Sequence, residues 1–315
     1  MTTFSLGTKK RVGDRSWTST IARHLAAASL AAGLAVAGPS PAAMAAIDTP
    51  HLVVSDATGT LAEPELDRLA GQAQALLERI LAFWSADSGT ERFGKIALIF
   101  DAPRRDAYSS VFYWENDNGR RRRVVRVFGF EARPQMLAHK LASAAFPQKD
   151  KLIRNAMGIL TEMHLGNPLT FPLCGLDADD WVRAFINTGL TIPLAELGPE
   201  QESWGMRMAA GGRVSVFDRA KQHIAYAEAG SFGAYLYHTF GIDKMKRLHH
   251  LSQTKDRPMR EAFGADLAAI EAAWLAAVSA EGKTRMAQSS MAARLMEAGP
   301  ATACTEAQRS AADKP

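Results

Sequence analysis

His139, Lys140 and Ser143 stand in one short stretch, His-Lys-Leu-Ala-Ser, whose residue types and spacing come nearest to a reaction centre in this sequence. Residues four positions apart lie on the same face of a helix, so His139 and Ser143 would be one turn apart. Histidine can bind a metal or carry a proton near neutral pH, whereas a lysine ammonium has no lone pair to accept a proton. The stretch therefore offers a single metal ligand or base.

Other residues with reactive side chains fit structural roles better. No two histidines are three or four positions apart, so no helix can present a histidine pair to a metal. Ser231 lies in Ala-Gly-Ser-Phe-Gly, which lacks the first glycine of a nucleophile elbow, and a helix N-cap is its expected role. Asp177, Asp179 and Asp180 lack EF-hand spacing and precede a predicted helix, so capping is favoured over calcium binding.

The elements that must position these residues follow an α+β order. Apolar residues recur at helical spacing over residues 63–84, and buried-type strands are predicted over 52–55 and 95–101. Two further strands flank an Asn-Asp-Asn-Gly turn, which predicts a hairpin of residues 110–114 and 123–130. Helices are predicted after this hairpin over residues 134–146, 150–160, 180–194, 231–240, 243–251 and 266–278. A mixed sheet with hairpin and helices (46–147) is expected to precede a mainly helical lobe (148–280).

The first 45 residues are predicted to be a signal peptide. They account for the whole net charge of +4, and an apolar run over residues 25–38 leads to Ala43-Met44-Ala45, a form that signal peptidase accepts. The rest of the chain is neutral, which removes the electrostatic case for a nucleic-acid partner. We expect cleavage after Ala45, a periplasmic or extracellular protein, and no stable membrane span after cleavage. An uncleaved membrane anchor is the alternative.

The chain has two cysteines, Cys174 and Cys304, so one disulfide is possible. An exported protein permits the bond, but pairing geometry cannot be derived from sequence. Cys304 lies within residues 281–315, where Ala, Ser, Gln, Lys and Glu predominate and large apolar groups are few. We expect this tail to be disordered.

The helix that carries His139 directly follows a predicted strand, and this order resembles the gluzincin metallopeptidases, specifically their peptidase MA-like domain. In that domain a helix bearing HExxH follows an edge strand, and a second helix supplies a glutamate ligand. Residues 180–191, 230–241 and 262–274 resemble the second ligand helix and two later helices of the family. The resemblance covers residues 52–278 and implies a zincin-like fold over residues 46–280.

The positions that the resemblance assigns to zinc chemistry are changed in this chain. His139 keeps the first ligand position, but Ser143 replaces the second histidine, Thr188 replaces the third ligand and Lys140 replaces the general base. Neutral hydroxyls are weak zinc ligands, and a lysine ammonium repels a dication. One imidazole retains a small part of the roughly 10 kcal/mol of a complete zinc site. We expect no catalytic residue and no cofactor; Tyr235 lies near the position of the family's transition-state tyrosine without aligning to it.

The resemblance implies a secreted, catalytically inactive domain that acts as a peptide-binding, protein-binding or scaffold protein. Such domains hold extended peptides beside the strand that precedes the HExxH helix, which implies binding along Val124, Val125, Val127, Phe128 and Phe130. An extended peptide or an envelope protein is the expected partner. Two alternatives stay open: a zinc-dependent metallopeptidase with a non-standard ligand set, and a structural envelope protein whose groove its own side chains fill.

Overall fold

A computed structural model describes residues 46–103, 110–117, 119–130, 136–208 and 214–280, together with Ala292, Glu297 and Cys304. The predicted signal peptide and most of the predicted tail lie outside the described residues. The described residues all belong to one compact unit, Ala43–Pro315.

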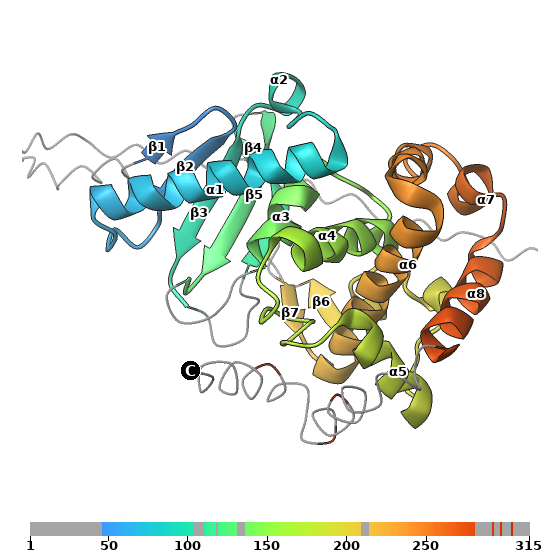
Figure 1. Ribbon diagram of the computed structural model, residues 1–315. Helices are drawn as coiled ribbons and strands as arrows, with labels where there is room; N and C mark the ends of the chain where they lie inside the picture. Colours follow the sequence, from blue (N-terminus) through green and yellow to red (C-terminus); the bar gives the residue numbers. More distant parts are fainter. Residues whose placement is uncertain are drawn as a thin grey trace, which may run out of the picture. The chain divides into compact units, whose positions relative to one another are not determined.

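The N-terminal part forms a mixed five-stranded sheet (Figure 1). Its strands are β1 (Ala46–Asp48), β2 (Leu52–Asp56), β3 (Ile96–Asp101), β4 (Ser110–Asp117) and β5 (Arg120–Phe128), in the spatial order β1-β2-β3-β5-β4. β2, β3 and β5 run parallel, whereas β1 and β4 pair antiparallel at the two edges. Strands early in the chain and helices later confirm the α+β prediction.

The strand predicted to bind a peptide is an interior strand. β5 pairs with β3 on one side and with β4 on the other. Val124, Val125, Val127 and Phe128 are buried, and Phe130, just after β5, is half-buried. The prediction of an open edge along these residues is therefore wrong. The hairpin exists as predicted, but its first strand, β4, forms the sheet edge.

One face of the sheet is covered by α1 (Glu63–Trp84) and α3 (Leu137–Ala145) (Figure 1). The buried residues of α1 recur at helical spacing and meet alternate residues of β3 and β5, such as Leu98 and Val125, in one apolar core. Each fully buried Leu, Ile or Val contributes about 1.5–3 kcal/mol. This packing fixes the start of α3, and so His139, against the sheet.

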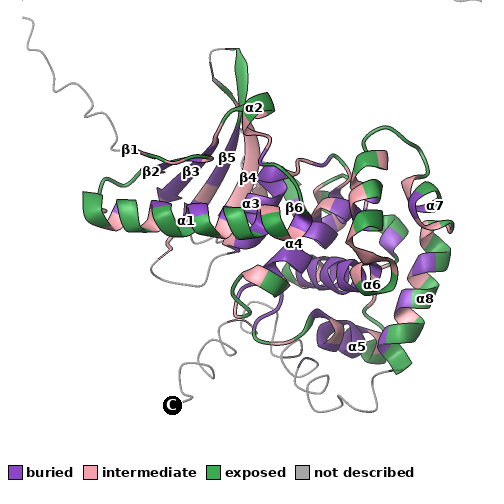
Figure 2. Ribbon diagram, turned by 45° about the horizontal axis from the view of Figure 1, so that its top comes forward, coloured by how far each residue is buried: buried purple, intermediate pink, exposed green. Residues whose placement is uncertain are grey.

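The helical part is built around α4 (Lys151–Leu165), which packs between α3 and α6 (Arg219–Leu251) and is mostly buried (Figure 2). Two glycines permit the close approach. A Cβ on Gly158 would lie 2.4 Å from the His139 ring, and one on Gly233 would lie 2.5 Å from the Ala156 carbonyl oxygen. α5 (Ala178–Thr188), α7 (Pro258–Phe263) and α8 (Leu267–Ala280) pack against α6. The connection from α5 to α6 contains 3₁₀ turns at Leu194–Glu196 and Glu202–Trp204 and a ribbon of β6 (Met206–Met208) and β7 (Val214–Val216).

The helix predicted to begin at Ser231 begins twelve residues earlier. α6 starts at Arg219, where the Asp218 side chain accepts a hydrogen bond from Lys221 N, and it is interrupted only at Gly241 (φ 80°, ψ 167°). Ser231 is buried inside this helix; its hydroxyl donates to Asp179 and accepts from the Trp274 indole. The N-cap prediction is wrong, because the residues before Ser231 are mostly small and apolar and continue the helix.

Cys174 and Cys304 form a disulfide, which ties residue 304 to the segment between α4 and α5. Ala292, also within the predicted tail, is fully buried. Neither position fits a tail that is free of the domain. In the described part of the chain, no helix has both the length and the apolar character that crossing a membrane requires.

Candidate functional site

A cavity of about 150 Å³ lies beside His139, between β4, α3, α4, α6 and the β6–β7 ribbon. His139, Lys140 and Ser143 of α3 all line it, so the structure brings these predicted site residues together. The remaining lining residues are Ser110, Val111, Phe112, Tyr113, Lys151, Arg154, Asn155, Gln201, Met206, Val214 and Tyr226. Among the lining residues that the structure describes, every charged or titratable side chain is a lysine, an arginine, a histidine or a tyrosine.

Lys140 is buried with no hydrogen-bond partner for its ammonium among the described residues. Its Nζ lies 6.0 Å from the centre of the Tyr226 ring. Burial, and then the nearby Arg154 charge, lowers the pKa of Lys140 from 10.5 to about 7, although Glu162 partly opposes this. Burial and these same two cations lower the pKa of His139 well below 6.5. The imidazole is therefore neutral near pH 7.

Glu162 connects α4 to α3 by hydrogen bonds to the backbone. Its Oε2 accepts from His139 N at 2.8 Å, and its Oε1 accepts from Asn167 N at 3.0 Å. A carboxylate at this place satisfies an N–H of the first turn of α3, which has no partner inside the helix. Burial raises the pKa of Glu162 to about 7. The carboxylate is not among the described residues that line the cavity, although it acts on Lys140.

Two further cations reach the cavity from α4. Lys151 is buried; its Nζ donates to Gln201 Oε1 at 2.5 Å and lies 4.9 Å from the centre of the Trp204 ring. Arg154 is half-buried and donates to the Gln148 carbonyl at 3.2 Å. Burial, then Arg154 and Lys140, lowers the pKa of Lys151 to about 6. Near pH 7 the Lys151 amine is therefore mostly neutral and the Lys140 amine is about half protonated, while the Arg154 guanidinium keeps its charge.

Thr188 and Tyr235 are not among the described residues that line this cavity, so the structure does not bring them together with His139 there. Thr188 is exposed at the end of α5, where its hydroxyl donates back to the Ala184 carbonyl at 2.7 Å. α5 packs on α6 and α8, whereas α3 packs on α4. Tyr235 is half-buried beside Phe240. The tyrosine at the cavity is Tyr226, whose pKa burial raises to about 12.

The side chains around His139 do not suit zinc. The neighbouring donors are the Ser143 hydroxyl and the Asn155 amide, neither of which supplies the charge or the soft donor of a zinc ligand. Lys140, Lys151 and Arg154 would repel a dication. Among the described residues, no group of three or more His, Cys, Asp or Glu side chains is arranged to hold a metal.

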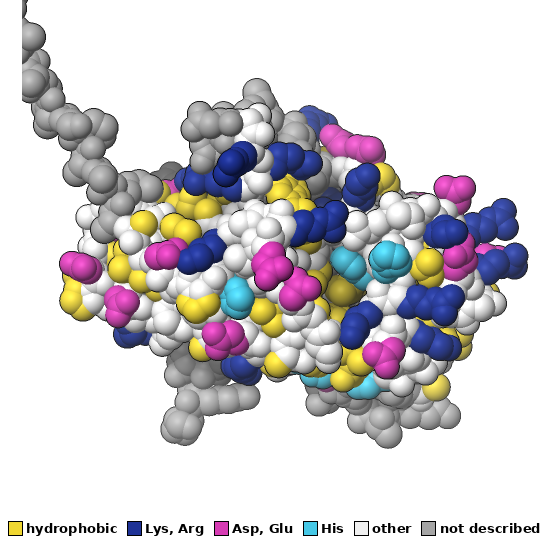
Figure 3. All heavy atoms as spheres, turned by 90° about the horizontal axis from the view of Figure 1, so that it is seen from above, with side chains coloured by type: hydrophobic (Ala, Val, Ile, Leu, Met, Phe, Trp, Pro, Cys, Tyr) yellow, Lys and Arg dark blue, Asp and Glu magenta, His cyan; other side chains and the backbone are white. Residues whose placement is uncertain are grey.

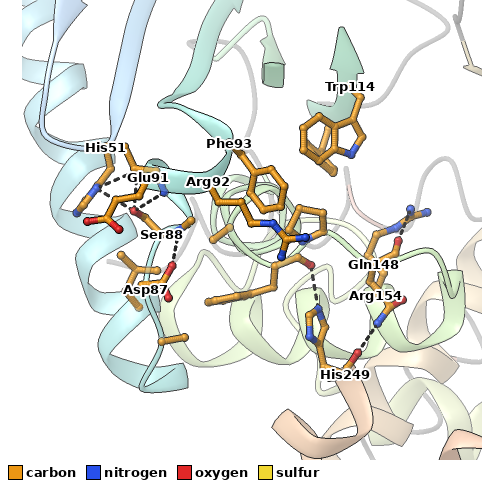
Figure 4. Close-up of a pocket in the computed structure, with 18 of the residues that line it drawn as sticks. His51, Asp87, Ser88, Glu91, Arg92, Phe93, Trp114, Gln148, Arg154 and His249 are labelled. Carbon is orange, nitrogen blue, oxygen red and sulfur yellow. Dashed lines mark hydrogen bonds between the residues drawn. The ribbon is translucent and has the colours of Figure 1, made fainter. Parts of the chain in front are cut away.

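Figure 4 shows a larger groove, about 1390 Å³ in volume. This groove and the small cavity share the lining residues Phe112, Tyr113 and Arg154. The groove extends from His51 and the short helix α2 (Thr90–Phe93) past β4 to His249 of α6. Aromatic rings, cations and carboxylates all line it. Figure 3, which views the molecule from above, shows side chains of both charges mixed with apolar ones on this face.

Ser88 and His51 form a hydroxyl–imidazole pair in this groove. Ser88 Oγ lies 3.0 Å from His51 Nδ1 and 2.6 Å from Thr90 Oγ1. A serine nucleophile needs its base to be oriented by a third group. Within the described residues, the hydrogen bonds of His51 include no carboxylate. The pair instead joins the segment before β2 to the start of α2.

Both cavities follow the edge of β4. Successive side chains of a strand point to opposite faces of the sheet, so a cavity beside one face touches alternate residues only. The small cavity touches the four consecutive residues 110–113, and the groove touches residues 112–114. The two cavities together therefore border five consecutive residues, 110–114, of β4. Among the described strands, β4 pairs only with β5.

Lys151, Arg154, Asn155 and Tyr226 were not predicted as site residues. The sequence does contain a signal for three of them: positions 151, 154 and 155 have the i, i+3, i+4 spacing of one helix face. This polar face interrupts an otherwise apolar helix, so it marks a buried polar site.

Comparison of the chain with protein-family models, with curated proteins and with solved structures gave no match.

Proposed function

We propose that this protein binds an extended polypeptide segment, which it adds as a strand to β4 and does not hydrolyse. The observation that carries the proposal is that two cavities with shared lining residues together border the five consecutive residues 110–114 of the edge strand β4. An edge strand offers unpaired N–H and C=O groups, and strand addition satisfies them. The proposal keeps the binding mode that the gluzincin resemblance implies but moves it from β5 to β4.

The side chains of the groove suit a polypeptide of mixed composition. Phe93, Phe112 and Trp114 offer aromatic surfaces to apolar residues. Arg92 and Glu91 offer charges of opposite sign. Main-chain hydrogen bonds supply affinity in strand addition, while such pockets for alternate side chains supply specificity.

The donors around His139 favour binding over hydrolysis. Hydrolysis by the family's chemistry needs a metal-bound water and a base, and here a lysine and a serine stand at the matching positions. His139 is neutral, buried and packed against Gly158, which leaves it as part of the helix packing. We infer an exported binding or scaffold protein of peptidase MA-like ancestry; the basic and apolar N-terminus supports export.

The test uses amidated seven-residue peptides of alternating threonine and valine with an N-terminal fluorophore. Binding to the full-length chain is followed by fluorescence anisotropy, and mass spectrometry checks that the peptide stays intact. In strand addition, only every second backbone N–H of the peptide points to β4. A peptide N-methylated at the residues whose N–H groups point to β4 should lose binding. A peptide N-methylated at the intervening residues should keep it.

A side-chain control accompanies the peptides. Val111→Asp, at the β4 edge, should weaken binding, whereas Val53→Asp, at an exposed position of β2, should leave it unchanged. Equal binding of the two N-methylated peptides would overturn strand addition. Cleavage of the peptide by the protein would overturn the proposal that the site is inactive.

A further inference from the structure

We propose that the cavity formed by Lys140, Lys151, Arg154, Ser143 and Asn155 binds the C-terminal carboxylate of the polypeptide that lies along β4. This inference rests on the proposed strand addition, because the peptide backbone would bring its terminus into the cavity. Strand addition gives the path of the peptide along β4, and the cavity gives the position of its C-terminal end.

The basic side chains that line the cavity favour an anion as its ligand. Lys140 and Lys151 are buried and Arg154 is half-buried, and all three line a space of about 150 Å³. None of the three forms an ion pair with a described carboxylate. Buried cations are normally paired, because an isolated buried charge is strongly unfavourable. A bound anion would supply the missing partner.

The described carboxylates that act on these basic side chains are not among the residues that line the cavity. Glu162 interacts with Lys140 but is directed to the backbone of α3. Glu200 and Glu202 act weakly on Lys151, and Asp150 acts on Arg154 while it caps α4. No carboxylate is among the described residues that line the cavity. The cavity is thus open to a negative group from outside.

Two neutral side chains add hydrogen-bonding capacity. The Ser143 hydroxyl is buried and has no hydrogen-bond partner among the described residues, and the buried Asn155 Nδ2 makes no hydrogen bond of regular geometry there, although the Asn155 side chain acts on His139. Ser143 is 5% exposed and Asn155 is 2% exposed, and both line the cavity. A buried donor without a partner is unfavourable by about as much as a lost hydrogen bond, which a ligand oxygen would restore.

The size and position of the cavity suit a chain terminus. Its volume corresponds to about five water molecules at roughly 30 Å³ each, which is room for a carboxylate with a small residue. Ser110 and Val111 of β4 line it, and the larger groove meets it at Phe112 and Tyr113. A strand laid along the groove therefore reaches the cations at one end.

The first experiment isolates the terminal group. N-acetylalanine and N-acetylalanine amide are compared at equal ionic strength for their effect on the Tm of the full-length chain. The carboxylate compound should raise Tm by about 2 °C or more above the amide at saturating concentration. The difference should vanish in Lys140→Met and in Lys151→Met and persist in Lys255→Met, whose lysine is exposed and does not line the cavity.

The second experiment joins the terminus to the strand. The fluorescent seven-residue peptide with a free carboxylate should bind at least tenfold more tightly than its amide, because bonds to charged groups are the stronger class. Inorganic phosphate, as a competing anion, should reduce this advantage. Equal Tm shifts with N-acetylalanine and N-acetylalanine amide would overturn the carboxylate site, even if both seven-residue peptides bind. If N-acetylalanine alone shifts Tm and neither peptide binds, strand addition is overturned and the anion site stands.

Discussion

Replacing Lys140 by methionine should stabilise the free protein. Methionine keeps an unbranched side chain of similar length but carries no charge. The pKa of Lys140 falls from 10.5 to about 7 on folding, and one pKa unit corresponds to about 1.4 kcal/mol. Burial of this lysine therefore disfavours folding by about 4 kcal/mol at pH 7. Relaxation around the ammonium reduces the recoverable part, so we expect a gain of about 1–4 kcal/mol in the free energy of unfolding.

The gain should depend on pH in a defined direction. A base with a lowered folded pKa binds fewer protons in the folded than in the unfolded protein between the two pKa values. This lysine therefore makes the wild type more stable as pH rises from about 7 to 10.5, and its unfavourable contribution is fully present below pH 7. The difference between Lys140→Met and wild type should be largest at pH 6 and should shrink toward pH 10.

Urea unfolding followed by tryptophan fluorescence at pH 6, 7.5 and 9 measures this difference. Lys255→Met, which removes an exposed lysine, serves as the control and should change the free energy of unfolding by less than about 0.5 kcal/mol. Destabilisation by Lys140→Met at pH 6 would refute the reasoning, because it would show that the ammonium has a compensating partner. A gain that does not vary with pH would refute the assigned cause.

Three further outcomes are expected. Arg123→Lys should lower the free energy of unfolding by about 3–5 kcal/mol in urea, because the fully buried guanidinium donates to three backbone carbonyls that an ammonium cannot all reach. Burial raises the pKa of Glu228 from 4.5 to about 8, so this group should lower the free energy of unfolding of the wild type as pH rises from about 4.5 to 8. Glu228→Gln should remove this decrease, and equal pH profiles of the variant and the wild type would contradict the prediction. Purified protein should contain well under one zinc per chain by mass spectrometry; stoichiometric zinc that His139→Ala abolishes would show a working metal site.

Long periodic segments could be predicted from sequence. The helix predicted over residues 63–84 is α1 at the same bounds, because its apolar residues recur along a single face. The hairpin was also predictable from its turn. Which of its strands would join β3 was not, since both carry valine and aromatic residues. The choice depends on packing: Val125 and Val127 of β5 meet α1 and α3 in the core, and such long-range contacts leave no local pattern.

The candidate site was predictable only along α3. His139, Lys140 and Ser143 lie on a short helix, so their spacing alone brings them to one cavity. The partner helix was assigned by resemblance to α5 through Thr188, whereas the structure uses α4. Gly158 explains this, because the helix backbone can approach the His139 ring only where no side chain intervenes. A glycine inside an amphipathic helix has many possible reasons, so sequence alone does not identify the helix it contacts.

The charge of the cavity restricts its ligand more than its shape does. A pocket of this size could hold water or an apolar group, but neither would offset the repulsion among Lys140, Lys151 and Arg154. Hydrophobic residues of similar volume would pack the same space with greater stability. Burial first, and then the charges of neighbouring basic groups, lowers the pKa of both lysines, so the protonated lysines are unfavourable in the free protein. A negatively charged ligand stabilises them directly, and β4 is the element along which a polypeptide can deliver one.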